Sequence, residues 1–315
     1  MLVTTIWSQH VCNDYSAVVR IGSATMTGGD MKHGLFLPPF DGLADVERMA
    51  DLAVLAEETG WDGFFVWDHL RYPAPARDIL DPYVCLAVMA ARTSRITLGP
   101  MVTPLIRRRP QVVARQAVTL DRLSKGRLVM GFGIGDDYPG GELACFGELT
   151  DAVERGRALN EGIAIFRGLV SGDEVNITGE FLRAQEVAFQ PRAYRGDGIP
   201  VWTAGRWPNP APIRRAAHHE GMMVIQMTEP EQVIELTAKL LEAGADLDHF
   251  DIAVWGQRDE EMVYREDQRH AQWAQAGVTW FLTGPGPFNL IFDEVREYVA
   301  AGPPRYETKS KKSIV

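Results

Sequence analysis

Eight short apolar runs follow one another along the chain, and each is followed by a stretch with helical spacing of apolar positions. The runs are continuous, as in Phe64-Phe65-Val66-Trp67, and do not alternate between apolar and polar positions. Such runs are typical of strands buried on both faces of a parallel sheet. They span residues 33–38, 63–68, 96–102, 128–133, 199–205, 222–226, 252–256 and 278–283. Eight strand–helix units predict an α/β fold, a closed (β/α)8 TIM barrel with its site at the C-terminal strand ends.

Helices are expected after each of the first four strands, because their ends carry recognisable residues. Asp81 and Asp151 place a capping carboxylate before a helical stretch. Pro82 and Pro110 stand at first helical positions, where the missing N–H of proline costs no hydrogen bond. Gly60 follows the first helical stretch, where a left-handed C-terminal cap is expected.

One barrel domain accounts for most of the chain. A chain of 315 residues, 46% of them hydrophobic, is sufficient for one such barrel without a second domain. We place the barrel at residues 31–302, with a small hairpin inserted before the fifth strand, where 175–191 contains two extended pieces. Residues 1–30 lack the pattern of a signal peptide and are expected to be a disordered or peripheral extension. Residues 303–315 are expected to be a C-terminal tail.

Composition excludes several classes of partner. The formal net charge of -10 argues against a nucleic-acid partner, because nucleic-acid binding depends on a basic face. No apolar run approaches the roughly 20 residues needed to cross a bilayer. The three cysteines, Cys12, Cys85 and Cys145, are far apart and not at metal-ligand spacing, so we expect packing or surface thiols in a reducing cytoplasm.

Residues that do not serve core packing gather at the ends of the predicted strands. They are Asp68-His69, Met101-Val102-Thr103-Pro104, Gly133-Ile134-Gly135-Asp136-Asp137 and Ala204-Gly205-Arg206. The C-terminal ends of barrel strands meet at one mouth, so we expect these residues to form a site.

His69 is the candidate for proton transfer, because histidine is the side chain whose unperturbed pKa lies near neutrality. The alternative is a histidine that binds loop backbone beside an ion-paired Asp68. No Cys or carboxylate partner stands at ligand spacing from the other histidines, so we expect no metal site.

The glycine-rich segment 131–135 does not predict a dinucleotide fold, because the following Asp136, Asp137, Tyr138 and Pro139 cannot open the helix that would hold a pyrophosphate. It allows either a flat ligand close to the backbone or a tight turn. The basic run 107–109 either contacts an anion or forms a solvated face. No nucleophile elbow, phosphate-binding loop or carboxylate pair stands out, so we expect a cofactor to supply the reactivity.

Five segments form a recognisable set. They are Lys32-His33-Gly34-Leu35-Phe36-Leu37-Pro38-Pro39, Trp67-Asp68-His69, Leu98-Gly99-Pro100-Met101-Val102-Thr103-Pro104 with Arg107-Arg108-Arg109-Pro110, Leu120-Asp121-Arg122-Leu123-Ser124-Lys125-Gly126-Arg127 and Trp202-Thr203-Ala204-Gly205. Together they resemble the bacterial luciferase-like superfamily over roughly residues 31 to 300.

The resemblance implies an oxidoreductase that binds FMN or the deazaflavin coenzyme F-420 (F420) at the strand ends. It implies a cis peptide bond between Met101 and Val102, against which the ring packs. The residues that it implies in cofactor binding are Asp68, Met101, Val102, Thr103, Ile134, Gly135, Ala204, Gly205 and Arg206, with phosphate at Ala204-Gly205.

The resemblance also implies two catalytic residues. His69 would assist proton transfer, and Asp136 would stand at the catalytic acid position of deazaflavin-dependent dehydrogenases. Some deazaflavin relatives have Glu at that position, so the shorter Asp136 is a departure from the pattern. A second departure is His219-Glu220-Gly221, which replaces the common Asp-Gly pair before the sixth strand.

We therefore expect an enzyme that uses reduced FMN or F420 for hydride transfer or oxygen insertion on a small organic substrate. A separate flavin reductase and a homodimer are the expected partners. The alternatives are a non-catalytic flavin-binding or storage protein, and an F420-dependent dehydrogenase or reductase without oxygen chemistry. A barrel hydrolase without flavin is a weaker third hypothesis.

Overall fold

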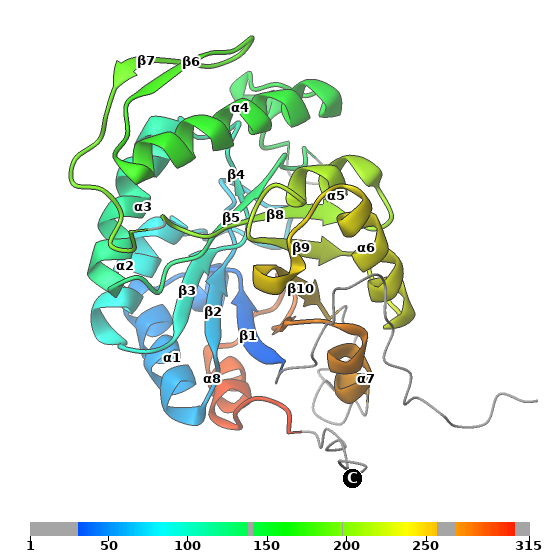
Figure 1. Ribbon diagram of the computed structural model, residues 1–315. Coiled ribbons are helices and arrows are strands. Elements are labelled where there is room, and N and C mark those ends of the chain that lie inside the picture. Colours follow the sequence, from blue (N-terminus) through cyan, green and yellow to red (C-terminus); the bar gives the residue numbers. More distant parts are fainter. Residues whose placement is uncertain (1–30, 138–140, 197, 257–268, 306–315) are drawn as a thin grey trace, which may run out of the picture.

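The computed structural model describes residues 31–137, 141–196, 198–256 and 269–305, and these form an α/β barrel (Figure 1). The barrel strands are β1 (Lys32–Leu37), β2 (Gly63–Val66), β3 (Thr97–Pro100), β4 (Thr103–Pro104), β5 (Met130–Gly133), β8 (Val201–Arg206), β9 (Gly221–Ile225), β10 (Asp251–Trp255) and β11 (Trp280–Thr283). Each predicted apolar run coincides with one of these strands, except that the third is divided into β3 and β4.

The barrel closes through the divided third strand. The strands pair in parallel in the order β3-β2-β1-β11-β10-β9-β8-β5-β4. Only Met101 and Val102 separate β3 from β4 in the chain, so the two ends of this order belong to one continuous segment. A parallel bridge between Leu98 and Leu128 joins β3 to the residues before β5. The prediction of a closed (β/α)8 barrel is therefore confirmed.

The helices surround this sheet (Figure 1). They are α1 (Val46–Thr59), α2 (Pro82–Arg92), α3 (Pro110–Ser124), α4 (Ala152–Ser171), α5 (Pro210–Ala216), α6 (Glu231–Glu242), α7 (Arg269–Ala276) and α8 (Phe292–Ala300). The side chains of Asp81 and Asp151 accept hydrogen bonds from backbone N–H groups in the first turns of α2 and α4, as predicted. Gly60 ends α1 in the left-handed conformation, with φ of 94°.

Aromatic side chains fill the barrel interior. The rings of Phe65, Trp202 and Trp280 lie 5.5–5.6 Å apart, centroid to centroid, and all three side chains are buried. The barrel is thus a packed core below its mouth, as in other barrels of this type. Ligands can therefore approach only at the strand ends.

The predicted hairpin is present as β6 (Val175–Thr178) and β7 (Arg183–Val187), paired antiparallel. It lies along the outer side of α4 (Figure 1). The Glu161 carboxylate on α4 accepts the backbone N–H groups of Glu180, Phe181 and Leu182 at 2.8–2.9 Å, which fixes the hairpin turn to the helix.

Some sequence predictions concern residues that the structure does not describe. The proposed extension 1–30, with Cys12, and residues 306–315 of the proposed tail lie outside the described residues.

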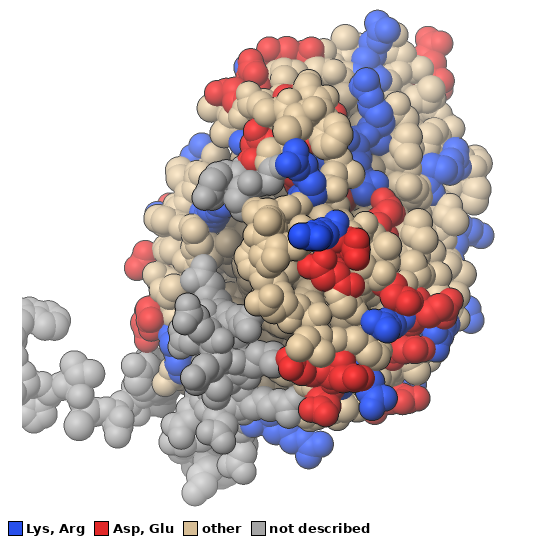
Figure 2. Space-filling model, turned by 180° about the vertical axis from the view of Figure 1, so that it is seen from behind, with Lys and Arg blue, Asp and Glu red and all other residues tan. Residues whose placement is uncertain are grey.

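Within the described ranges, Cys85 is buried and Cys145 exposed, and both are free thiols. No helix in these ranges is long and apolar enough to span a bilayer. Acidic and basic side chains are interspersed with uncharged surface on the face seen in Figure 2.

Candidate active site

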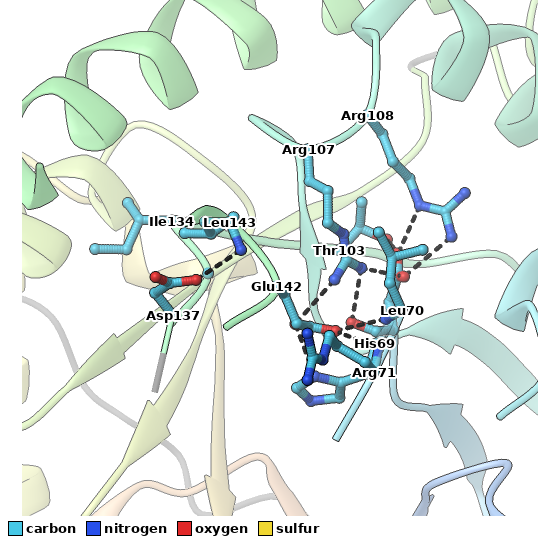
Figure 3. A network of polar contacts seen from close by, with 12 residues as sticks. His69, Leu70, Arg71, Thr103, Arg107, Arg108, Ile134, Asp137, Glu142 and Leu143 are labelled. Carbon is cyan, nitrogen blue, oxygen red and sulfur yellow. Dashed lines mark hydrogen bonds and ion pairs between the residues drawn. The ribbon is translucent and has the colours of Figure 1, made fainter. Parts of the chain in front are cut away.

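A buried ion-pair network that includes Arg107 and Arg108 lies at the barrel mouth (Figure 3), and the carboxylate of Asp68, just after β2, is its centre. Arg107 Nη2 lies 2.5 Å from Asp68 Oδ1, and Arg108 Nε lies 2.9 Å from Asp68 Oδ2. The Thr103 hydroxyl donates to Oδ2 at 2.8 Å. The side chain of Asp68 has no exposed surface. Its charge is therefore compensated by protein groups from the segment 103–108.

A second buried carboxylate, Glu142, joins this network from the loop between β5 and α4 (Figure 3). Its Oε1 accepts the backbone N–H groups of Leu70 and Arg71, at 2.5 and 3.1 Å. Its Oε2 lies 3.0 Å from Arg107 Nη1 and 3.0 Å from His69 Nδ1. One carboxylate thus ties together the loops that follow β2, β4 and β5.

His69 lies between this carboxylate and a wall of aromatic rings. The ring centroids of Phe40 and Trp67 are both 5.9 Å from the imidazole, and that of Tyr72 is 4.9 Å away in an edge-to-face contact. The His69 side chain remains 28% exposed. The imidazole is therefore held by Glu142 and by aromatic rings, and it remains partly exposed.

The electrostatic environment keeps Glu142 ionised. Burial alone raises the pKa of Glu142, but the hydrogen bond and charge of His69, with Arg107 and the N–H of Arg71, lower it below its usual value. Burial, and then the Glu142 charge, raise the pKa of the Tyr72 hydroxyl. The site thus holds a carboxylate and a neutral phenol at neutral pH.

Five apolar side chains at or near the C-terminal strand ends are partly exposed, and we call this set the apolar floor: Val102, Ile134, Ala204, Ile225 and Trp255. They belong to or follow the strands β3, β5, β8, β9 and β10. The peptide bond between Met101 and Val102 is cis, as the resemblance implies. A floor of this kind offers dispersion contacts to a flat, apolar ligand.

The glycines of β5 allow Val102 to reach this floor. A Cβ on Gly131 would lie 2.5 Å from Met101 Sδ and 2.6 Å from the Pro100 carbonyl oxygen. A Cβ on Gly133 would lie 3.0 Å from Val102 Cγ2. These two glycines thus accommodate the neighbouring strand segment 100–102.

Asp136, the predicted acid, belongs to a separate and more exposed pair. Its Oδ2 lies 2.6 Å from Arg206 Nη2, and both side chains are about half exposed. The backbone carbonyls of Ile134 and Gly135 accept hydrogen bonds from buried Arg155, at 3.3 and 2.8 Å, which orders the segment before Asp136. Gly205 is buried against α5, where a Cβ would lie 2.2 Å from Pro212 Cβ.

The structure thus brings His69, Asp68 and Thr103 into one network, whereas Val102, Ile134 and Ala204 are partly exposed at or near other strand ends of the barrel. Sequence reasoning missed Glu142, although this residue follows the same strand end as Asp136. It left the basic run 107–109 open between an anion site and a solvated face; Arg107 and Arg108 instead pair with buried Asp68. No group of three or more His, Cys, Asp or Glu in the described ranges could hold a metal ion.

The chain is similar to a known protein family, to individual proteins in sequence and to solved structures in fold. The family model described as luciferase-like monooxygenase matches residues 16–302. The F420-dependent glucose-6-phosphate dehydrogenase of Nakamurella multipartita is 33% identical over 165 residues, which is 51% of this chain and 47% of that protein. The chain therefore spans about half the length of the curated relatives it matches.

Two solved structures share the fold. The coenzyme F420 dependent tetrahydromethanopterin reductase from Methanopyrus kandleri superposes with a TM-score of 0.68 at 18% identity, covering 87% of this chain and 99% of that one. The type II Baeyer-Villiger monooxygenase of Pseudomonas putida, solved in complex with FMN, gives a TM-score of 0.59 at 16% identity, covering 85% of this chain and 83% of that one. At these identities the likeness establishes the barrel fold alone.

Proposed function

Because the chain belongs to the luciferase-like monooxygenase family, we propose that it is an oxidoreductase that binds F420 over the apolar floor and transfers a hydride to or from a small organic substrate. The observation that carries this proposal is that His69, which follows β2 at the same barrel mouth, is held by buried Glu142 and remains 28% exposed. A proton-transfer group next to a flat apolar surface is the arrangement that hydride chemistry on an oxygen-bearing carbon requires.

The residues present fit the ring of such a cofactor. All five floor residues are apolar and partly exposed, and they come from neighbouring strand ends. Of the predicted binding residues, Val102, Ile134 and Ala204 would contact the ring, whereas Asp68 and Thr103 would act through the network beneath it. Arg206, exposed at the end of β8, would interact with an anionic part of the cofactor.

When bound, F420 accepts or donates a hydride. In the oxidative direction His69 would accept the hydroxyl proton of the substrate as the carbonyl product forms. In the reductive direction His69 would return that proton to the carbonyl oxygen. Asp136 at the mouth is a second candidate for proton transfer. Its ion pair with Arg206 is weak because both side chains are about half exposed to solvent. The family relative acts on glucose 6-phosphate, so a hydroxyl-bearing carbon is the proposed reacting centre.

A second candidate function is an FMN-dependent monooxygenase, which the description of the matching family favours. The same floor would hold the flavin ring, and a separate flavin reductase would be the expected partner. The aromatic wall around His69 would help to exclude water from the reacting atoms.

Equilibrium titration of the purified protein with F420 and with FMN, each oxidised and reduced, tests the proposal. Tighter binding of F420, with F420 reduction on addition of an alcohol substrate, supports the first function. Tighter binding of reduced FMN with oxygen consumption supports the second. Coloured protein that turns over neither cofactor indicates storage, and binding of neither excludes both functions.

We propose that the enzyme works as a homodimer in the cytoplasm. Val84 on α2 and Val112 on α3 are apolar and more than half exposed, which supports a partner surface there. Light scattering of the purified protein tests the dimer, and a monomer at micromolar concentration would contradict it.

A further inference from the structure

We propose that Glu142 is a positioning residue that fixes the tautomer of His69, so that Nδ1 carries the proton and Nε2 presents its lone pair to the substrate. This inference rests on the proposed role of His69 in proton transfer. None of the sequence motifs pointed to Glu142, which is 73 positions away from His69 in the chain.

In its contacts with neighbouring groups, the Glu142 carboxylate can act only as a hydrogen-bond acceptor. Two backbone N–H groups donate to its Oε1, from Leu70 and Arg71. The Arg107 guanidinium, which is permanently charged, lies 3.0 Å from Oε2. Among the described residues, the other contact of Oε2 is His69 Nδ1 at 3.0 Å. An ionised carboxylate has no proton to donate, so the hydrogen of this bond must be on Nδ1.

The surroundings hold the carboxylate in this state. Its side chain is 4% exposed, and Arg107, itself 2% exposed, lies between Glu142 and Asp68. The other ionisable groups near the pair are Tyr72, whose ring packs on His69, and Arg71 and Cys145 on the two adjoining loops. Asp137 shapes the loop by accepting the N–H of Leu143 at 2.6 Å (Figure 3).

The consequence concerns the second ring nitrogen. With Nδ1 protonated, Nε2 of neutral His69 is an acceptor and can take a substrate proton; with the opposite tautomer it could not. Protonation of Nε2 then places a positive charge beside the Glu142 carboxylate, which stabilises it. A carboxylate that orients an imidazole in this way acts without touching the substrate.

Nitrogen-15 NMR of histidine-labelled protein without cofactor tests the tautomer directly. The signal of His69 is assigned by its absence from the spectrum of His69→Gln. We expect the neutral imidazole of wild-type His69 to show the proton on Nδ1. In Glu142→Gln the amide can either donate or accept, so we expect a mixture of both tautomers. Predominance of the Nε2–H form in wild type overturns the proposal, even if the variant fails to fold.

Steady-state kinetics give a second readout. Glu142→Gln should lower kcat by about 10-fold or more and change its pH profile, while KM and cofactor affinity change less than about 3-fold. Glu148→Gln is the matched control, because Glu148 lies on the same loop and its carboxylate makes no ion pair or hydrogen bond within the described ranges. Equal effects of the two substitutions, or an unchanged pH profile, contradict the positioning role.

The two readouts separate this inference from the proposed function. If neither F420 nor FMN binds, the proposed function fails while the NMR result still decides the tautomer. If a cofactor binds and turns over but His69 has its proton on Nε2, only the inference fails.

Discussion

Asp68 and Arg107 form an ion pair at the barrel mouth whose two side chains are 0% and 2% exposed. Arg107 Nη2 also donates to the main-chain carbonyl of Asp68 at 2.9 Å. The same guanidinium lies against Glu142, which in turn contacts His69. The imidazole therefore depends for its position on a chain of buried charges, and changes anywhere in that chain have measurable effects.

Replacing Asp68 by Asn should lower the free energy of unfolding by about 3 kcal/mol, because a buried guanidinium would lose its main counter-charge. Asp51→Asn is the control, since Asp51 pairs with Arg92 on the surface, and a loss below about 1 kcal/mol is expected there. Urea unfolding measures both. Similar losses in the two variants would show that the Asp68 network contributes no more than a surface ion pair.

His69→Ala should reduce turnover by about 100-fold or more and change cofactor affinity much less, because the imidazole is assigned to proton transfer and the floor to binding. His249→Ala, an exposed histidine on a different loop, should leave both unchanged. Turnover and equilibrium titration provide the comparison. Equal losses in the two quantities for His69→Ala would contradict the assigned role.

Gly205→Ala should destabilise the protein by about 1–3 kcal/mol, because the added methyl group would overlap Pro212, whose ring cannot move away by rotation. Gly196→Ala meets nothing within 4 Å and should change stability by less than about 1 kcal/mol. Thermal or urea unfolding without cofactor measures the difference. If Gly205→Ala is as stable as the wild-type protein, close contact with a ligand remains as the explanation for glycine at this position.

Stability should fall as the pH is lowered through the range of histidine titration. Burial and then neighbouring His270 lower the pKa of His33 from 6.5 to about 4, and burial and then Arg167 lower the pKa of His219 to about 4. Between these values the unfolded chain binds protons that the native state does not, so the free energy of unfolding decreases towards acid pH.

Urea unfolding at about pH 7.5 and about pH 5.5 tests this prediction. Wild type should lose stability between the two values, and His33→Phe should lose less, because the substituted side chain no longer titrates. His219→Phe should reduce the loss in the same way. A loss of stability that neither substitution reduces would assign the acid sensitivity to other groups.

The barrel was predictable from sequence because its strands are buried on both faces and separated by capped helices. Continuous runs such as Phe64-Phe65-Val66-Trp67 and caps such as Asp81 are local signals, and both have the expected structure. The division of the third strand at Met101 and Val102 has no such signal in the apolar pattern. The cis peptide bond at this point was implied only by the family resemblance.

The position of the candidate site at the strand ends could be predicted from the sequence, but not all of the residues that form it. His69, Val102, Ile134 and Ala204 could be proposed from the sequence because they lie at or near strand ends that must meet at one mouth. Glu142 was missed because a loop carboxylate that is buried has the same local sequence context as a solvated one. Its pairing with His69 depends on how two loops fold across the mouth, which residue spacing does not encode.

The most direct test of the central claim is a crystal structure of the protein with bound F420, or with FMN if that cofactor binds more tightly. We predict that the ring lies within about 4 Å of Val102, Ile134 and Ala204 and faces His69 Nε2. A cofactor bound away from these strand ends, or a floor covered by side chains that leave no room for the ring, would contradict the account.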